Sequence, residues 1–370
     1  MAASAIGKAA AILGAAAALL AGAARAQPAN DAAIPPYQHV FIIIEENKDY
    51  RLIQDPKLAP NIARLAKTYG NATNFYAEVH PSEANYVAMV GGDTYGIHDD
   101  DAFSCRPGLT DKVLCPGAEM PGYVDHTVEA PHLGDLLAAK GLTWKGYYES
   151  LPAPGSLAVF ASDPKVEHGG TSAPVYASKH SGFLNFRSAQ QDPSRAQHIV
   201  GFDQLRADIA KDALPNFALI VPNQCNEMHG APQPTLPADC GRTGMEPLIR
   251  RGDAEVGRLV AELQKTRAWR SKQNMAIVVT FDEDSSRSRD GCCGVTPGEA
   301  SNYGGGHIPT IVITNHGPRG VEDPTPYSHY SLLRTLQDAF GVQPYLRHAG
   351  DTDQGVQPMV KLFEVKKQGG

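Results

Sequence analysis

The apolar segment Val40-Phe-Ile-Ile-Ile44, followed at once by Glu45-Glu46-Asn47, decides the fold class of this chain. A continuous apolar run without polar alternation is typical of a parallel strand that is buried on both faces. In open α/β sheets, ligands bind beyond the carboxyl ends of the strands. Carboxylate and amide oxygens at that place can hold a hard cation. An acidic turn in solvent is the alternative, and it is favoured when this cluster is considered alone.

Three more apolar segments have polar residues directly after or before them. They are residues 216–221, followed by Asn226 and His229, residues 276–281, followed by Asp282-Glu283, and residues 308–313, preceded by His307. Helices are expected at residues 60–67, 131–140, 202–209, 256–263 and 330–340. This alternation predicts an α/β fold with a mostly parallel, doubly wound sheet and a site along one edge.

Residues 80–85, His-Pro-Ser-Glu-Ala-Asn, place a hydroxyl between an expected strand at 73–79 and an expected helix at 85–90. Free backbone N–H groups and the helix dipole attract an anion at such a junction. A phosphoserine would be stabilised there, so we predict that Ser82 is a nucleophile. Serine is also a frequent helix cap, and Ser82 considered alone fits that simpler role better.

The first 26 residues have the pattern of a secretory signal peptide. Lys8 supplies a positive start, residues 9–23 are apolar, and Ala24-Arg-Ala26 is a cleavage site of small residues. A membrane anchor is the alternative, but the apolar run is short for a bilayer and rich in alanine. We therefore expect a signal at 1–26 and a single domain at 27–370, periplasmic or secreted, without a stable membrane anchor.

The charge balance is acidic and excludes one class of partner. The chain has 33 basic and 40 acidic residues, and removal of Lys8 and Arg25 with the signal leaves 31 basic residues and a net charge of −9. Nucleic-acid binding needs a basic face, so we expect no nucleic acid as partner. The oligomeric state does not follow from the sequence.

The six cysteines suit disulfides in an oxidising compartment. The local pairs Cys105–Cys115 and Cys225–Cys240 are plausible, although the sequence alone does not choose among the possible pairings. Cys292 and Cys293 are adjacent and can pair only by straining the peptide between them, so exchange with another pair stays open. A zinc site is the alternative, but no C-x-x-C is present.

Acids, amides, a hydroxyl and histidines near strand ends suit metal-assisted phosphoryl transfer. A divalent metal would lower the pKa of the Ser82 hydroxyl and neutralise phosphate charge. The oxygen ligands would be Glu46, Asn47, Asp282 and Glu283. His229 and His307 would bind phosphate oxygens or protonate the leaving group. A Ser-His-Asp hydrolase is disfavoured because no G-x-S-x-G is present. The sequence also contains no Walker loop and no G-x-G-x-x-G followed by a suitable acid, the glycine motifs of nucleotide-binding proteins.

Several motifs resemble a family of bacterial and fungal phosphoesterases, which includes secreted acid phosphatases and phosphocholine-type phospholipases C. The matching motifs are Glu46-Asn47, Ser82-Glu-Ala-Asn85, Pro222-Asn-x-Cys-Asn226-x-Met-His229, Asp282-Glu283, His307-Ile-Pro309 and Tyr327-Ser-His-Tyr-Ser-Leu-Leu-Arg334. Together they span roughly residues 38 to 345. The resemblance implies an alkaline-phosphatase-like α/β fold.

The resemblance also assigns roles to individual residues. It implies one divalent metal ion of unknown identity, a phosphoserine on Ser82, and a small phosphate ester as substrate. The implied metal ligands are Glu46, Asn47, Ser82, Asp282 and Glu283. The implied phosphate-binding residues are Asn85, His180, His229 and His307.

Two departures from the family pattern bear on the substrate. Ala84 stands where the family usually has proline, and Asp284-Ser-Ser follows the Asp-Glu motif where the phospholipases commonly have His-Gly-Gly. The chain also lacks the long C-terminal extension of those phospholipases. The Asp284-Ser-Ser sequence and the missing extension favour a phosphomonoesterase, an acid phosphatase, over a phosphodiesterase or phospholipase C. A noncatalytic periplasmic binding protein on the same fold is a further alternative, which the presence of all five metal-ligand candidates disfavours.

Overall fold

The structure is a computed structural model of the chain. It describes Met1 and residues 34–103, 123–166, 173–231, 235–241, 244–294 and 303–365. The chain divides into two units, Met1–Ala32 and Ala33–Gly370, and everything below concerns the second. Cys105, Cys115 and the proposed signal segment after Met1 lie outside the described residues.

Nine strands of the described residues form one sheet in the order β10-β2-β9-β8-β1-β7-β3-β6, with β11 paired to β2. The strands are β1 (His39–Glu45), β2 (Gly70–Tyr76), β3 (Trp144–Tyr148), β6 (Ile199–Gly201), β7 (Phe217–Val221), β8 (Met275–Phe281), β9 (His307–Thr314), β10 (Val321–Asp323) and β11 (Tyr327–Ser328). A separate antiparallel pair consists of β4 (Phe160–Ser162) and β5 (Pro174–Ala177).

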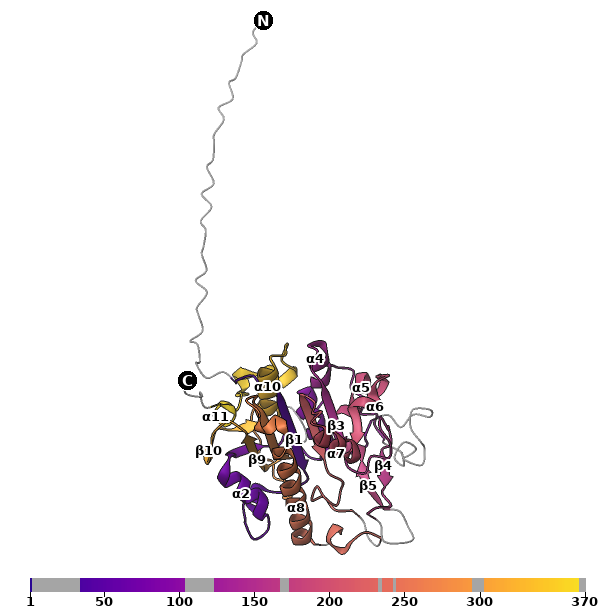
Figure 1. Cartoon of the computed structure of the whole chain (residues 1–370). Coiled ribbons are helices and arrows are strands. Elements are labelled where there is room, and N and C mark those ends of the chain that lie inside the picture. Colours follow the sequence, from indigo (N-terminus) through magenta and orange to yellow (C-terminus); the bar gives the residue numbers. More distant parts are fainter. Residues whose placement is uncertain are drawn as a thin grey trace. The chain divides into compact units, whose positions relative to one another are not determined.

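The sheet is mostly parallel, which confirms the predicted α/β class. Strands β8, β1, β7, β3 and β6 are parallel to one another. Strand β9 is the exception, because it runs antiparallel to both β8 and β2. Consequently the start of β9 lies at the same edge as the ends of β8, β1 and β2, and Figure 1 shows β1 near the middle of the sheet.

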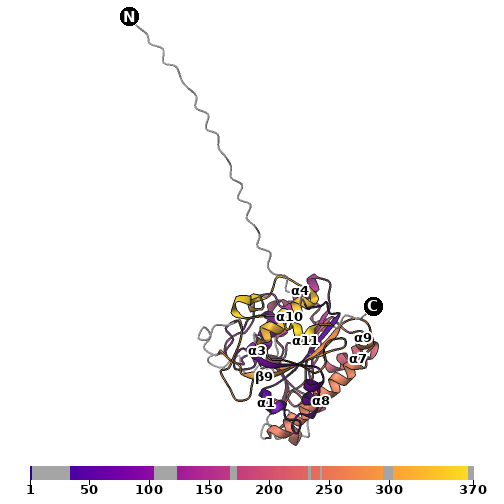
Figure 2. The same cartoon turned by 90° about the vertical axis from the view of Figure 1, so that its left-hand side faces the viewer.

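Helices cover the sheet on two sides, and in Figure 2 α3 and α10 lie on one side while α7 and α8 lie on the other. The helices are α1 (Tyr50–Ile53), α2 (Pro60–Thr68), α3 (Glu83–Gly91), α4 (Leu133–Ala139), α5 (Arg187–Gln191), α6 (Arg195–His198), α7 (Phe202–Lys211), α8 (Met245–Gln264), α9 (Arg267–Arg270), α10 (His329–Phe340) and α11 (Val360–Phe363). The six helices expected from the sequence all occur, although α8 begins well before the expected residue 256.

The core follows directly from the apolar strands. Every residue of Val40–Ile44 and of Met275–Phe281 is fully buried, because helices pack on both faces of these central strands. Burial of one such Ile or Val side chain stabilises the fold by about 1.5–3 kcal/mol. The polar residues that follow each strand are therefore held at the rim of a rigid element.

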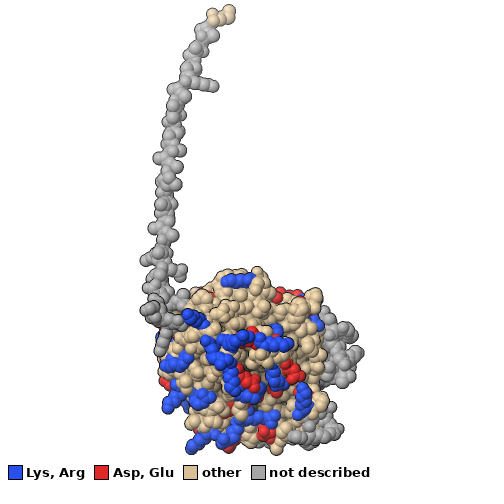
Figure 3. All heavy atoms as spheres, in the orientation of Figure 1, with Lys and Arg blue, Asp and Glu red and all other residues tan. Residues whose placement is uncertain are grey.

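The exposed side of α8 carries ion pairs along its length. Arg250 pairs with Glu246 at 2.9 Å and Arg258 with Glu262 at 2.7 Å. Figure 3 shows Lys and Arg side chains close to Asp and Glu on this face. Exposed pairs of this kind contribute about 0.3–0.5 kcal/mol each to stability. They therefore stabilise the helix slightly and do not determine the fold.

Two disulfides occur in the described residues. Cys225 pairs with Cys240, which confirms the local pairing expected from their spacing. Cys292 pairs with its neighbour Cys293, so the structure selects the adjacent pairing over exchange with another cysteine. The first disulfide closes the loop that carries His229.

Candidate active site

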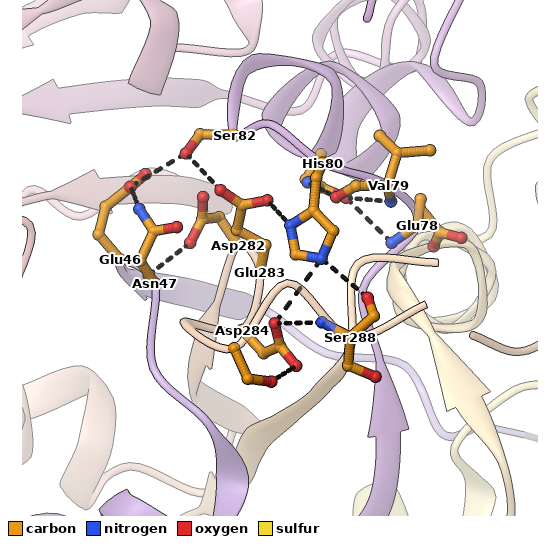
Figure 4. Close-up of polar contacts among 12 residues, drawn as sticks. Glu46, Asn47, Glu78, Val79, His80, Ser82, Asp282, Glu283, Asp284 and Ser288 are labelled. Atoms are coloured by element: carbon orange, nitrogen blue, oxygen red, sulfur yellow. Dashed lines mark hydrogen bonds and ion pairs between the residues drawn. The ribbon is translucent and has the colours of Figure 1, made fainter. Parts of the chain in front are cut away.

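The site is built at the edge where β1, β2 and β8 end. Strand β1 delivers Glu46 and Asn47, strand β8 delivers Asp282 and Glu283, and Ser82 follows β2 at the start of α3. These five residues are the predicted metal ligands, and hydrogen bonds among them show that the sheet brings them together. Figure 4 shows their side chains facing one another across the strand ends.

Ser82 lies at the N-cap position of α3, but its side chain makes no capping hydrogen bond. Its Oγ instead donates to Glu46 Oε2 or to Glu283 Oε1, each at 3.2 Å. The residue is 2% exposed. Helix capping therefore does not explain this serine. Its hydroxyl instead lies within hydrogen-bond distance of two carboxyl groups.

Asn85 fixes the turn that presents Ser82. Its Oδ1 accepts the backbone N–H groups of Glu78 and Val79 at 2.9 and 3.2 Å, and its Nδ2 donates to Val79 O at 2.8 Å. The side chain is fully buried. The predicted phosphate contact of Asn85 stays a prediction, because in this structure its amide holds the end of β2 against α3.

Three buried carboxyl groups surround Ser82. Glu46 and Asp282 are fully buried and Glu283 is 6% exposed. Asn47 ties them together, because its backbone N–H donates to Asp282 Oδ1 at 2.9 Å and its Nδ2 donates to Glu46 Oε2 at 2.5 Å. Asn47 adopts a left-handed backbone with φ of 50°, which asparagine tolerates better than most residues.

Burial and mutual repulsion raise the pKa of these acids. Burial, followed by the charge of Glu283, raises the pKa of Asp282 to about 7. Burial, followed by the charges of Asp282 and Glu227, raises the pKa of Glu46 well above its ordinary value. Adjacent carboxylates that repel one another in a dry site are stabilised by a cation.

A divalent metal fits this set of donors. Within the described part of the chain, Asp282 Oδ2 and Glu227 Oε2 accept no hydrogen bond. Ligand atoms of Glu46, His180 and His229 also lie within 4.8 Å of one another. Carboxylate and amide oxygens suit Mg²⁺, Ca²⁺ or Mn²⁺, whereas a mixed set with imidazole suits other ions as well.

His180 and His229 extend the site on the side of β7. His180 lies in a 3₁₀ turn, η2 (Ser178–His180), and its Nε2 is 3.2 Å from Glu46 Oε1. The rings of His180 and His229 are 5.5 Å apart. Both histidines were predicted to bind phosphate, and the structure places both beside Glu46.

Sequence reasoning missed Glu227, which is fully buried and contacts both His180 and Glu46. Its Oε1 is 2.9 Å from His180 Nδ1, and its backbone oxygen accepts the N–H of Glu46 at 2.7 Å. Its place in the polar stretch after β7 was the available signal. A carboxylate on Nδ1 directs Nε2 of the ring toward the ligand.

His80 is a second residue whose role the sequence did not reveal. Its Nδ1 hydrogen-bonds Glu283 Oε2, and its Nε2 is 2.9 Å from Ser288 O (Figure 4). Burial lowers the pKa of His80, but the hydrogen bond and charge of Glu283 outweigh burial and raise it overall. His80 thus holds one oxygen of Glu283 while the other faces Ser82.

Lys48 joins the end of β1 to the loop that carries His229. Its Nζ donates to three backbone oxygens, those of Glu46, Asn47 and Met228, at 3.3, 3.0 and 2.9 Å. The side chain is 5% exposed, and burial lowers its pKa. This ammonium fixes the spacing between the Glu46 and His229 sides of the site.

His307 lies at the same sheet edge but has other contacts. Its ring stacks on Tyr50 at 4.4 Å, and its Nε2 is 3.0 Å from Thr73 O. Neither contact involves the cluster around Ser82. Its predicted role in phosphate binding stays a prediction that these contacts do not support.

Comparison with known proteins identifies the class to which this site belongs. A family model matches residues 53–343, which is most of the chain, and its description is the Phosphoesterase family. The protein is accordingly a phosphoric ester hydrolase. The chain belongs to the Phosphoesterase family, which confirms the resemblance seen in the motifs.

Two curated relatives align over most of this chain. A phosphatidylinositol-3-phosphatase of Mycobacterium tuberculosis is 30% identical over 313 residues, which cover 84% of this chain and 79% of that protein. An acid phosphatase of Aspergillus fumigatus is 28% identical over 306 residues, which cover 83% of this chain but 55% of that protein. The chain therefore spans little more than half of the fungal relative.

A solved structure shares the fold at low sequence identity. It comes from work on glycosaminoglycan metabolism by Bacteroides thetaiotaomicron, and it has a TM-score of 0.51 and 13% identity. The match covers 89% of this chain and 82% of that chain. At this identity the likeness concerns the fold alone.

Proposed function

We propose that the protein is a secreted, metal-dependent phosphomonoesterase that acts through a phosphoserine on Ser82. The observation that carries the proposal is the hydrogen bonding of a buried hydroxyl to Glu46 and Glu283 at a helix N-terminus. An anionic phosphate is stabilised at such an end. The proposed metal ligands are Glu46, Asn47, Ser82, Asp282 and Glu283.

The residues of the site suit two successive displacements. Ser82 Oγ attacks phosphorus and gives its proton to Glu46 or Glu283, while the bond from phosphorus to the ester oxygen breaks. His180 or His229 then gives a proton to the leaving alkoxide. Water then attacks the phosphoserine and gives a proton to the same histidine, while the bond from phosphorus to Ser82 Oγ breaks. Glu46 or Glu283 returns the proton to Ser82, and phosphate leaves. A bound divalent cation would neutralise charge on the phosphate.

The two relatives are both phosphatases by name, which supports a phosphatase over a phosphodiesterase. The pattern of residues 1–26 supports secretion, with a single domain at 27–370. Among the described residues, no helix is both long and apolar enough to cross a bilayer. The proposed partner is a small phosphate ester, and no nucleic acid.

The test compares p-nitrophenyl phosphate with bis-p-nitrophenyl phosphate on protein purified from the periplasm or medium. Wild type, Ser82→Ala and a chelated sample are assayed side by side, and N-terminal sequencing checks for a start at Gln27. We expect fast hydrolysis of the monoester, slow hydrolysis of the diester, and loss of both in Ser82→Ala and after chelation.

Each other result removes one part of the proposal. Preference for the diester would move the protein to the phosphodiesterases. Full activity of Ser82→Ala would remove the phosphoserine, and full activity after chelation would remove the metal. No hydrolysis with any added divalent cation would favour a noncatalytic binding protein.

A further inference from the structure

Lys179 is a nearly buried cation that no step above uses. It precedes His180 in η2, its side chain is 12% exposed, and its Nζ donates to Asp100 Oδ2 at 2.8 Å. An ammonium has three N–H donors. Among the described residues, the bond to Asp100 is the one hydrogen bond that Lys179 Nζ makes, so two donors remain for a ligand.

Asp100 anchors this ammonium to the nucleophile helix. Its other oxygen, Oδ1, accepts the backbone N–H of Glu83 at 3.2 Å, and Glu83 directly follows Ser82 in the chain. One carboxylate thus joins Lys179 to the N-terminus of α3. The position of the ammonium relative to the Ser82 turn is therefore set by two short contacts.

The charge of Lys179 also acts on the buried acids of the site. Burial alone would lower the pKa of this ammonium. The charges of Asp100 and Glu46, followed by that of Asp282, outweigh burial and raise the pKa overall. In the other direction, Lys179 opposes the rise in pKa of Glu46 and Glu227. Geometry places this charge beside the site as well, because Lys179 directly precedes His180, whose Nε2 is 3.2 Å from Glu46 Oε1.

We propose that Lys179 binds the transferred phosphoryl group and makes the site prefer phosphate monoesters to diesters. The inference rests on the proposed phosphomonoesterase activity. A monoester carries close to two negative charges at neutral pH because its second pKa is about 6, whereas a diester carries one. A fixed ammonium with unused donors stabilises the additional charge and donates a hydrogen bond to the additional unsubstituted oxygen.

Lys145 shows what a purely structural lysine looks like in this protein. Its Nζ pairs with Asp208 Oδ2 at 2.5 Å, its side chain is 22% exposed, and it lies between β3 and α7. Both lysines are paired with one aspartate and are partly buried. Lys179 directly precedes the site residue His180, whereas Lys145 lies within β3 and pairs with α7, which makes Lys145 a matched control.

The experiment measures Lys179→Gln, Lys179→Arg and Lys145→Gln against wild type. Readouts are kcat/KM for p-nitrophenyl phosphate and its bis-ester, and Kd for inorganic phosphate by calorimetry with added Mn²⁺. For Lys179→Gln we expect roughly a 10- to 100-fold loss with the monoester and in phosphate affinity. The loss with the diester should be smaller, and Lys179→Arg and Lys145→Gln should stay nearer to wild type.

Two results would overturn the inference. One is an equal loss with both esters and in phosphate binding for Lys179→Gln and Lys145→Gln, which would indicate a general effect on folding. The other is an unchanged Kd for phosphate in Lys179→Gln. If wild type hydrolyses neither ester, the proposed activity fails, but the Kd comparison still decides whether Lys179 binds phosphate.

Discussion

The site has two halves that differ in how the chain positions them. The strand-end half consists of Glu46, Asn47, Asp282 and Glu283, which directly follow β1 and β8. The loop half consists of Lys179, His180 and His229, which lie in η2 and in the loop after β7. The first half is held by central strands. In the second half, Glu227 holds His180 and Asp100 holds Lys179. Lys48 holds the loop that carries His229, because it donates to the carbonyl oxygen of Met228.

The difference teaches that the sheet positions the backbone of the acid groups, whereas the cationic and imidazole groups depend on tertiary contacts for their position. A residue directly after a buried strand has almost no freedom to move. A residue in a loop must be fixed by its own hydrogen bonds. Variants in the two halves should therefore fail in different ways.

The largest effect is expected for Glu46→Gln in the strand-end half. Glu46 accepts from Ser82 and lies 3.2 Å from His180, so it serves both halves. We expect kcat/KM to fall by about 10³-fold or more, with loss of metal content by elemental analysis. Near-normal activity and metal content would contradict the assignment of Glu46 as a ligand.

The second effect concerns the pH dependence of the strand-end half without metal. The pKa of Asp282 is raised to about 7 in the folded protein, so between about pH 4 and 7 the folded state holds a proton that the unfolded state has released. Stability of the chelated protein should therefore fall as pH rises through this range, by on the order of 3–4 kcal/mol.

Thermal melts of the chelated protein measure this dependence. Asp282→Asn is the control, since its stability should vary less between pH 4 and 7. Added divalent cation should restore the stability of wild type at pH 7.5. A melting temperature of chelated wild type that rises over this range, in parallel with Asp282→Asn, would refute the expectation.

The third effect belongs to the loop half. For His180→Ala we expect roughly a 100-fold loss in kcat/KM, as for one directly acting group. Because the strand-end half keeps its sheet positions, metal content should change less than in Glu46→Gln. Equal loss of metal in both variants would show that the two halves form one metal site.

Much of this comparison could be anticipated from the sequence, and the reasons are physical. The runs Val40–Ile44 and Ala276–Phe281 fix strands, and a strand end fixes Glu46 and Asp282 within a residue. Ser82 was accessible because a turn with a hydroxyl before a helix is a local feature. The strand 73–79 was predicted slightly late, since β2 spans Gly70–Tyr76.

The rest depends on contacts between distant segments. Glu227 and His80 act through partners far away in the chain, and spacing does not show which loop residue will face a strand end. His307 shows the reverse problem. Its motif before a strand looks functional, and the antiparallel β9 starts at the edge of the sheet that carries the site, but Tyr50 and Thr73 engage its ring.

A smaller effect is expected for His80→Ala. The variant removes the hydrogen bond to Glu283 without touching the predicted phosphate position, so His80 is a positioning residue. We expect about a 10-fold loss in kcat at nearly unchanged KM. His80→Asn, whose amide nitrogen can take the place of Nδ1, should recover part of the rate if an N–H donor is what Glu283 requires. A change in KM alone would argue for substrate contact.

The smallest effect is expected for His307→Gln. Its ring is engaged by Tyr50 and Thr73, so kcat/KM for the monoester should stay within about twofold of wild type, well below the range for a directly acting group. His180→Gln assayed in parallel supplies the contrast. A loss for His307→Gln as large as that for His180→Gln would restore its predicted role in phosphate binding.

The carbonyl cradle of Lys48 has a consequence for protein engineering. Its ammonium donates to the backbone oxygens of Glu46, Asn47 and Met228. Two segments separated by nearly half the chain are therefore fixed to each other and have to be changed together. A designer who grafts a new loop into residues 222–230 to alter substrate range must keep the Met228 carbonyl in place. Otherwise the transplanted loop will shift Glu46, the acid that accepts a hydrogen bond from Ser82.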